Sequence, residues 1–324
     1  MIPSNLSQRI FLQKTSMEHI PVLLKEVITN LEIKSNGNYV DLTLGRAGHS
    51  KEILKQLKTG HLYAFDQDID AIEKSKKILE EISPNFSIYH TNFINMKEVL
   101  EKEGVYGKID GILMDLGVSS PQLDEDARGF SYRVDAPLDM RMDQRNSLSA
   151  SVIVNTYPYE ALVKILRDYG DERYASSIAK NIIKSRPINT TLELVDVIKR
   201  SKPSKELKKE GHPAKQAFQA IRIAVNDELN VLKETLKDAV DALAPNGRLL
   251  VISFHSGEDR IIKTYFKDLT VVEGTRINLP TKEVETKFTL ITHKPIEASE
   301  EELEANNRSH SAKLRIIMKK GEAL

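Results

Sequence analysis

Strand-like and helix-like patterns alternate along the first third of this chain, and that alternation constrains its fold more than any other feature. The strand-like runs, rich in β-branched and aromatic residues, are NYVDL (38–42), LYAFD (62–66), FSIYH (86–90), IDGILMD (109–115) and RLLVISF (248–254). Helical patterns separate the first four runs, which favours a mostly parallel sheet wrapped by helices. Two later runs, KFTLIT (287–292) and KLRIIMK (313–319), are predicted to pair as an antiparallel hairpin at one edge. The sequence therefore predicts an α/β fold with a seven-stranded sheet.

Two helical patterns are especially clear. Residues 69–82 follow an acid-rich start and predict one helix. A second, longer stripe has helical spacing and predicts a single helix that stops at the turn APNG (244–247). Its apolar positions are Val225, Leu229, Leu232, Leu236, Val240 and Leu243.

The domain organisation follows from where the alternation stops. Between residues 135 and 216 helical patterns follow one another without strands, which predicts an all-helical inserted domain at 135–216. The sheet domain then comprises 17–134 and 217–324. Ligands of open α/β sheets bind outside the carboxyl ends of the strands, so an insertion after the fourth strand would roof the site. We interpret residues 1–16 as a disordered leader, with an organellar address as the less favoured alternative.

Composition excludes several classes of site. The chain has no cysteine, which excludes disulfides and Cys-based zinc sites and favours a reducing, cytoplasmic compartment. No run approaches the roughly 20 apolar residues that span a bilayer. His49, His212 and His255 lie in unrelated segments without a second ligand at metal-binding spacing, so no metal site is predicted.

A cofactor site is predicted at VDLTLGRAGHS (40–50), where a strand runs into a glycine-bearing turn and then a helix. The turn has neither the GxGxxG of a dinucleotide site nor the GxxxxGK[ST] of a P-loop. Gly45 and Gly48 let backbone approach a ligand, and Asp41 suits a ligand that carries an ammonium or sulfonium group. S-adenosylmethionine is such a ligand.

Two further cofactor contacts are predicted at the ends of the second and third strands. Asp66 lies about twenty residues after the glycine turn, where a carboxylate reaches both ribose hydroxyls of an adenosine. Its alternative role is to cap the helix that begins near Asp68. Phe93 is placed to pack on the adenine ring, although a place in the core fits its position nearly as well.

A candidate catalytic loop follows the fourth strand, which ends at Asp115. An exocyclic base amine has its lone pair delocalised into the ring, so methylation needs an acceptor that orients its N–H. Candidate acceptors are Asp115, Ser119, Ser120 and Pro121. Phe130 and Tyr132 beyond the loop are candidates to stack on an extruded base, and anchoring the inserted domain is an equally weighted alternative.

A basic patch lies between Lys199 and Arg222, where eight Lys and Arg side chains face only Glu206 and Glu210. Such a patch is typical of a surface that follows a phosphate backbone. A solvated helical face is the alternative. Over the whole chain, 47 basic residues balance 47 acidic ones, so net charge alone does not indicate a nucleic-acid partner. His255, in ISFHSGEDR, follows the fifth strand at the same edge, and part of that motif, SGED (256–259), resembles a helix cap.

The chain resembles the RsmH (MraW) family of S-adenosylmethionine-dependent 16S ribosomal RNA (cytosine(1402)-N(4))-methyltransferases over nearly its whole length, from His19 to Arg315. The resemblance is most specific in the segment from Ile109 to Asp143. The motifs that carry it are HIPVLLKEV, DLTLGRAGHS, IDGILMDLGVSSPQLDEDARGFSYRVDAPLDMRMD, HPAKQAFQAIRIAVNDEL, ISFHSGEDR and SHSAKLR.

The resemblance implies a class I, Rossmann-like methyltransferase sheet interrupted by a helical substrate-side domain. It implies methyl transfer from S-adenosylmethionine to the N(4) amine of cytidine 1402 in 16S ribosomal RNA. The implied partners are a small-subunit particle and a second copy of the chain, in the cytoplasm and without a membrane. The cofactor contacts that it implies fall on Ala47, Gly48, His49, Asp66, Phe93, Asp115 and Gln122. The candidate RNA contacts are Phe130, Tyr132, Lys205, Lys208, Lys209, Lys215, Arg222 and His255.

Several positions depart from the family pattern. Ala47 replaces a second glycine, Gln216 a basic residue and Gly257 a leucine, and Asn307 with His310 interrupts the usual NPRxRSAKLR. Apart from Ala47 these positions bear on RNA affinity rather than on the cofactor. Two other functions are considered: a nicotinamide-dependent dehydrogenase, disfavoured by the missing third glycine, and a non-enzymatic RNA-binding assembly factor with a degenerate cofactor pocket.

Overall fold

The seven predicted strands form one sheet, with order β3-β2-β1-β4-β5-β7-β6. The computed structural model describes residues 21–117, 128–271 and 286–321. The first five strands are parallel, while β7 runs antiparallel to both β5 and β6. The strands are β1 (Asn38–Asp41), β2 (His61–Asp66), β3 (Phe86–His90), β4 (Ile109–Asp115), β5 (Leu243–Ser253), β6 (Phe288–Leu290) and β7 (Lys313–Lys319). The predicted α/β fold and the edge hairpin are confirmed.

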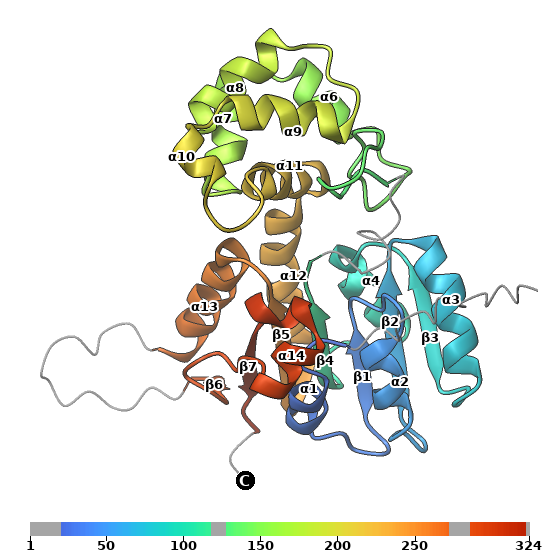
Figure 1. Cartoon of the computed structure of the whole chain (residues 1–324). Helices are drawn as coiled ribbons and strands as arrows, with labels where there is room; N and C mark the ends of the chain where they lie inside the picture. Colours follow the sequence, from blue (N-terminus) through green and yellow to red (C-terminus); the bar gives the residue numbers. More distant parts are fainter. Residues whose placement is uncertain (1–20, 118–127, 272–285, 322–324) are drawn as a thin grey trace, which may run out of the picture.

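Helices cover both faces of the sheet (Figure 1). One face packs on α1 (Leu24–Leu31), α2 (Gly48–Leu54) and α3 (Ile69–Glu80), which share a buried apolar cluster with the strands. The other face packs on α4 (Met96–Lys102), α12 (Glu228–Ala242) and α13 (Ser256–Thr270). Shorter segments are η1 (Phe93–Asn95), α14 (Glu300–Ala305) and η3 (Asn307–Ser311). Successive strand residues point to opposite faces of the sheet, so an apolar strand such as β4 contributes side chains to the buried clusters on both faces.

The segment between β4 and β5 builds a separate helical unit above the carboxyl ends of the strands (Figure 1). Its helices are α6 (Ala150–Thr156), α7 (Tyr159–Asp168), α8 (Ala175–Lys184), α9 (Thr191–Arg200), α10 (Ser204–Leu207) and α11 (Lys215–Asn226). They bury one apolar cluster that runs from Phe130 to Val225. The division at residues 135 and 216 stays a prediction, and this cluster favours an insert that extends to the end of α11.

The prediction of one long helix is wrong in one respect, because the helix is interrupted at Asp227. That residue has a left-handed φ of 49° and ends α11 before α12 begins. Val225 therefore packs in the helical unit, whereas Leu232 packs against the sheet. Helix α12 ends at Ala242, just before APNG as predicted, but APNG belongs to β5 rather than to a turn, and Leu243 already pairs with Ile109. Tertiary pairing overrides the local turn signal here.

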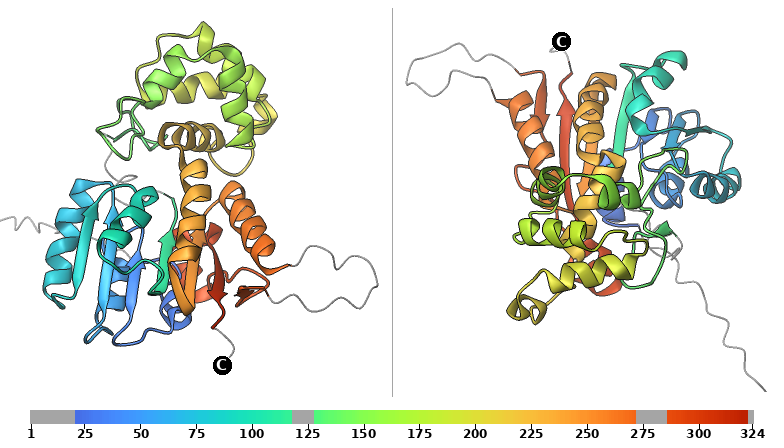
Figure 2. Two further views of the ribbon diagram at one scale, coloured as in Figure 1. Left: turned by 180° about the vertical axis from the view of Figure 1, so that it is seen from behind. Right: turned by 90° about the horizontal axis from the view of Figure 1, so that it is seen from above.

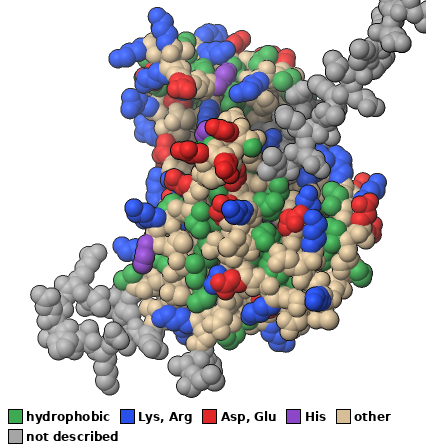
Figure 3. Space-filling model, turned by 60° about the horizontal axis from the view of Figure 1, so that its bottom comes forward, with side chains coloured by type: hydrophobic (Ala, Val, Ile, Leu, Met, Phe, Trp, Pro, Cys, Tyr) green, Lys and Arg blue, Asp and Glu red, His purple; other side chains and the backbone are tan. Residues whose placement is uncertain are grey.

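Helix α12 connects the two units, running from the helical insert along the sheet (Figure 2). Among the residues that the structure describes, no helix combines the length and apolar character that crossing a membrane requires. On the face drawn in Figure 3, basic and acidic side chains are intermixed, in keeping with the balanced charge of the sequence.

Candidate active site

A cavity of about 950 Å³ lies between the carboxyl ends of the parallel strands and the helical insert. On the sheet side its lining includes Thr43, Gly45, Asp66, Phe93 and Asp115, which follow or end β1, β2, β3 and β4. The insert contributes side chains including Tyr132, Lys209 and His212. This is the edge of an open α/β sheet where ligands bind. Of the predicted cofactor residues, the structure brings Gly48, His49, Asp66, Phe93 and Asp115 to one site with the insert.

The Asp41 side chain stabilises the glycine turn after β1 through hydrogen bonds. The Asp41 carboxylate accepts hydrogen bonds from Ser50 Oγ at 2.6 Å and from the Thr43 backbone N–H at 3.0 Å. It is buried and does not line the cavity. The position of Asp41 therefore supports a role in shaping the turn, while the direct ligand contact predicted for it lacks structural support.

Ala47 and Gly48 lie in the turn for different reasons. Ala47, the residue before α2, has a left-handed φ of 58°, a conformation that glycine adopts without steric cost. Gly48 lacks a positive φ, but a Cβ there would lie 2.4 Å from Cγ of Pro21. Gly48 is therefore required for packing, whereas the family's usual glycine at position 47 corresponds to a backbone requirement.

Asp66 faces the cavity with a partner on each oxygen. It accepts the backbone N–H of Gly45 and that of Asp68, each at 2.8 Å. A carboxylate oxygen has two lone pairs, so each oxygen retains one for a ligand hydroxyl. Asp68, and not Asp66, caps α3 by accepting the Asp70 N–H. Burial raises the pKa of Asp66 to about 6, although the two backbone donors oppose the shift. Ribose binding stays a prediction that this geometry permits.

Asp115 carries an unsatisfied oxygen at the end of β4. Its backbone N–H donates to Thr43 Oγ1 at 2.8 Å, but its Oδ1 is buried without a hydrogen-bond partner among the described residues. Burial raises the pKa of Asp115 to about 8, and the nearby negative charges of Asp41 and Glu258 add to the shift. A buried acceptor without a partner is costly, so this carboxyl is suited to a ligand that supplies a donor or a positive charge.

His49 completes this corner of the site. Its Nε2 lies 2.9 Å from the Val22 carbonyl oxygen, and its Nδ1 lies 3.8 Å from Asp115 Oδ2. The carbonyl can only accept, so Nε2 carries a proton and the neutral ring turns its Nδ1 lone pair toward Asp115. Burial lowers the pKa of His49, which the Asp41 charge partly opposes. The buried His49 ring therefore lies directly beside the Asp115 carboxyl.

Other predicted residues of the loop after β4 cannot be placed. Ser119, Ser120, Pro121 and Gln122 lie outside the described residues, so their predicted roles stay predictions. Phe93 begins η1, lines the cavity and packs partly against the sheet core. Its position fits both the adenine contact and the core role.

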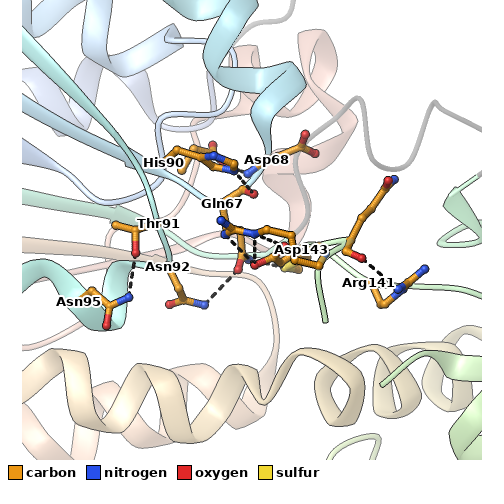
Figure 4. A network of polar contacts seen from close by, with 12 residues as sticks. Gln67, Asp68, His90, Thr91, Asn92, Asn95, Arg141 and Asp143 are labelled. Carbon is orange, nitrogen blue, oxygen red and sulfur yellow. Dashed lines mark hydrogen bonds and ion pairs between the residues drawn. The ribbon is translucent and has the colours of Figure 1, made fainter. Parts of the chain in front are cut away.

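Sequence reasoning missed a polar network beside Asp66 (Figure 4). Gln67 accepts a hydrogen bond from Asn92 Nδ2 on its Oε1 at 3.0 Å, and its Nε2 lies 3.4 Å from Met142 Sδ. Arg128 forms an ion pair with Asp68 at 3.1 Å and donates to the Met142 carbonyl. The network ties the ends of β2 and β3 to the start of the insert. Gln67 and Asn92 follow strand ends just as Asp66 and Phe93 do, so the same positional rule could have found them.

The aromatic residues beyond the loop are engaged inside the insert. The Tyr132 ring stacks on His212, with ring centroids 4.4 Å apart and planes 11° apart, and meets Phe218 edge-on. Phe130 is buried in the core of the insert. Both positions favour the alternative role of anchoring the inserted domain, and base stacking by Tyr132 would have to share a ring that already has a partner.

The basic patch divides into exposed and paired side chains. Lys205, Lys208 and Lys215 are exposed, while Lys209 pairs with Glu206 at 2.7 Å. Arg222 forms a two-pronged ion pair with Glu228, both contacts being 2.9 Å. The lysines remain candidates for RNA contact, whereas Arg222 is already neutralised in a structural pair that spans the α11–α12 break.

His255 caps α13. Its Nδ1 accepts the backbone N–H of Gly257 at 3.2 Å, and the Glu258 side chain accepts the His255 N–H. The cap therefore lies one residue before the predicted SGED start. Of the departures from the family pattern, Gln216 and Asn307 line the cavity, which fits their expected bearing on the substrate.

Comparison with known proteins agrees with these features. The model of the MraW methylase family matches residues 16–320. A curated relative named ribosomal RNA small subunit methyltransferase H, from Mesoplasma florum, is 55% identical over 94% of this chain and 99% of its own. Relatives of the same name from Exiguobacterium sibiricum and Oenococcus oeni are 53% and 52% identical, over 94% and 93% of this chain and 99% and 98% of their own.

Proposed function

The chain belongs to the MraW methylase family, and from that premise we propose that it methylates the N(4) amine of cytidine 1402 in 16S ribosomal RNA. The methyl donor is S-adenosylmethionine. The observation that carries the proposal is the buried, unpartnered Oδ1 of Asp115, at the strand edge of a cavity roofed by the insert. That oxygen supplies the acceptor that an exocyclic amine needs.

The residues present fit the methyl donor. A cavity of about 950 Å³ is at the upper end of the roughly 300–1,000 Å³ typical of ligand sites, which leaves room for a cofactor and a nucleotide. Asp66 keeps lone pairs for ribose hydroxyls, and Phe93 offers an apolar face for adenine. When bound, S-adenosylmethionine supplies a methyl group on a cationic sulfur, which retains the bonding electron pair as the methyl leaves.

Asp115 has two linked tasks in this mechanism. In the ligand-free protein its raised pKa keeps the carboxyl protonated at neutral pH. A neighbouring positive charge favours the ionised form, so the loaded site has a carboxylate there. This carboxylate accepts an N–H of the amine, directs the nitrogen lone pair at the methyl carbon and attracts the proton released from N(4). Orientation of this kind can contribute about 7 to 11 kcal/mol.

The insert is proposed to hold the RNA. A base must leave its stack to reach the site, and the exposed lysines of the patch, including Lys205 and Lys208, provide contacts to phosphates. Further parts of the proposal are a small-subunit particle as the physiological partner, a homodimer and a cytoplasmic location. The names of the relatives, which specify small-subunit ribosomal RNA, support the RNA part.

A methyl-transfer assay tests the proposal. Purified protein with S-adenosylmethionine is incubated with 16S ribosomal RNA or with small-subunit particles from cells lacking the gene, and nucleosides are identified by mass spectrometry. We expect N(4)-methylcytidine with at least one of the two substrates. Asp115→Asn should abolish it, while Asp110→Asn, at the opposite end of the same strand, should retain it. Absence of N(4)-methylcytidine on both substrates would contradict the proposal.

A further inference from the structure

A second cavity, of about 520 Å³, lies at the outer edge of the sheet between α13 and the β6–β7 hairpin. We call it the hairpin pocket. Its walls include Lys263, Lys267, Phe288, Thr292, His293 and Lys320. None of its lining residues lines the candidate active site. Its volume is within the range of small-molecule sites, and no role described above accounts for it.

The charged side chains that line the hairpin pocket are positive. Among the described residues, no Asp or Glu lines the pocket. Arg315 is neutralised by Asp259, at 2.7 Å. Lys263 and Lys267 are exposed and form no ion pair with another described residue. They lie four residues apart on α13 and so share one helix face, where like charges repel. An anion between them would relieve that repulsion.

The interior of the pocket offers a different chemistry. Phe266, Phe288, Leu290 and Ile316 form an apolar floor. Thr292 Oγ1 is buried there without a hydrogen-bond partner among the described residues, which is a costly arrangement unless a ligand satisfies it. Ammonium groups, a free hydroxyl and an apolar floor together match a nucleotide, with its phosphate and its flat base.

We propose that the hairpin pocket binds one phosphate-bearing nucleotide of the RNA substrate, outside the cavity in which the base is methylated. The choice of an RNA nucleotide rests on the proposed function. An RNA strand held in the active site is tethered, so even a weak contact at a second pocket adds to the overall affinity. The pocket would thus help to select RNA that extends beyond the target loop.

Binding of fluorescently labelled 16S ribosomal RNA fragments to the full chain, measured by anisotropy over a salt series, tests the inference. The double variant Lys263→Ala/Lys267→Ala should bind about 5- to 10-fold more weakly at low salt. Its log–log salt slope should fall by about 0.7, the value for one single-strand phosphate contact. Thr292→Val should weaken binding about 3-fold and leave the slope unchanged, because it removes a hydroxyl and no charge.

The matched control is Lys76→Ala/Lys77→Ala, which removes two exposed lysines from α3. It should leave affinity and slope unchanged. An equal loss in the control, or no loss in the pocket variants, would overturn the inference. Methylation is recorded separately. Wild-type protein that binds RNA but forms no N(4)-methylcytidine would contradict the proposed function alone, and the binding data would still decide on the pocket.

Discussion

At the scale of single residues, Asp115 is the side chain on which the proposed chemistry depends. Its Oδ1 lacks a partner among the described residues, and burial raises its pKa to about 8. Both features reflect the place of the carboxyl at the end of β4, where its Oδ1 is buried and Asp41 and Glu258 add negative charge. A cationic ligand reverses the balance and converts the carboxyl into an acceptor.

This leads to a prediction about pH. Below the ligand-free pKa, binding of a cation must release the Asp115 proton, so affinity for S-adenosylmethionine should rise with pH by up to about tenfold per unit and level off above pH 8. Calorimetry between pH 6.5 and 9 measures it. Asp115→Asn is the reference, because it retains the titration of the ligand's own amino group. Identical pH profiles for the two proteins would refute the linkage.

A second residue-scale prediction concerns Asp66. Asp66→Ala should weaken S-adenosylmethionine binding by roughly 10- to 100-fold, since hydrogen bonds to a charged group contribute about 1.5 to 3 kcal/mol. Asp70→Ala, on the exposed start of α3, is the control for removing a nearby carboxylate. If a folded Asp66→Ala protein, checked by its melting temperature, binds as tightly as wild type, the ribose assignment is wrong.

At the scale of elements, the turn between β1 and α2 separates two requirements that look alike in sequence. Ala47 has a positive φ, whereas Gly48 does not have a positive φ but has no room for a Cβ. A left-handed residue other than glycine costs about 1 to 2 kcal/mol. The turn therefore carries a strain that the family's usual glycine would remove.

Thermal or denaturant unfolding of two variants tests this account. Ala47→Gly should change the free energy of unfolding by less than about 1 kcal/mol and in the stabilising direction, because relief of strain exceeds the entropy gained by the unfolded chain. Gly48→Ala should destabilise by about 1 to 3 kcal/mol through overpacking against Pro21. The reverse order of the two effects would show that the turn is held differently.

Much of the element level could be predicted from the sequence, because strand and helix periods are local. Strands β3 and β7 match the predicted residue ranges. The break at Asp227 could not be predicted, since a left-handed aspartate inside an apolar stripe gives no local signal. The site divides in the same way. Asp66 and Asp115 follow from the rule for strand ends. The inward turn of Asp41 depends on its hydrogen bond with Ser50, and the Arg222–Glu228 pair depends on a helix break, and neither can be read from residue spacing.

At the scale of the whole molecule, the insert is tied to the sheet domain on both sides of the cavity. Arg128 pairs with Asp68 on one side, and Ser256 donates to Asp171 at 3.0 Å on the other. The exposed lysines of the patch belong to the insert, while the cofactor residues belong to the sheet domain. RNA affinity and cofactor affinity should therefore be separable by mutation.

Reversing Lys205, Lys208 and Lys209 to Glu should weaken RNA binding, reduce its salt slope by about 2 and leave S-adenosylmethionine affinity unchanged. Anisotropy and calorimetry give the two affinities. Lys58→Glu, Lys76→Glu and Lys77→Glu, at exposed positions of the sheet domain, make the same change in total charge outside the patch and serve as the control. An unaltered salt slope in the lysine variant would mean that the patch is a solvated face.

The central claim is that this chain methylates a cytidine amine in small-subunit ribosomal RNA through Asp115. Mass spectrometric mapping of methylated cytidines in that RNA, from cells with and without the gene, tests it most directly. The account predicts that N(4)-methylation of cytidine 1402 disappears without the gene, returns with the wild-type gene and fails to return with Asp115→Asn. Unchanged methylation without the gene, or full restoration by Asp115→Asn, would contradict it.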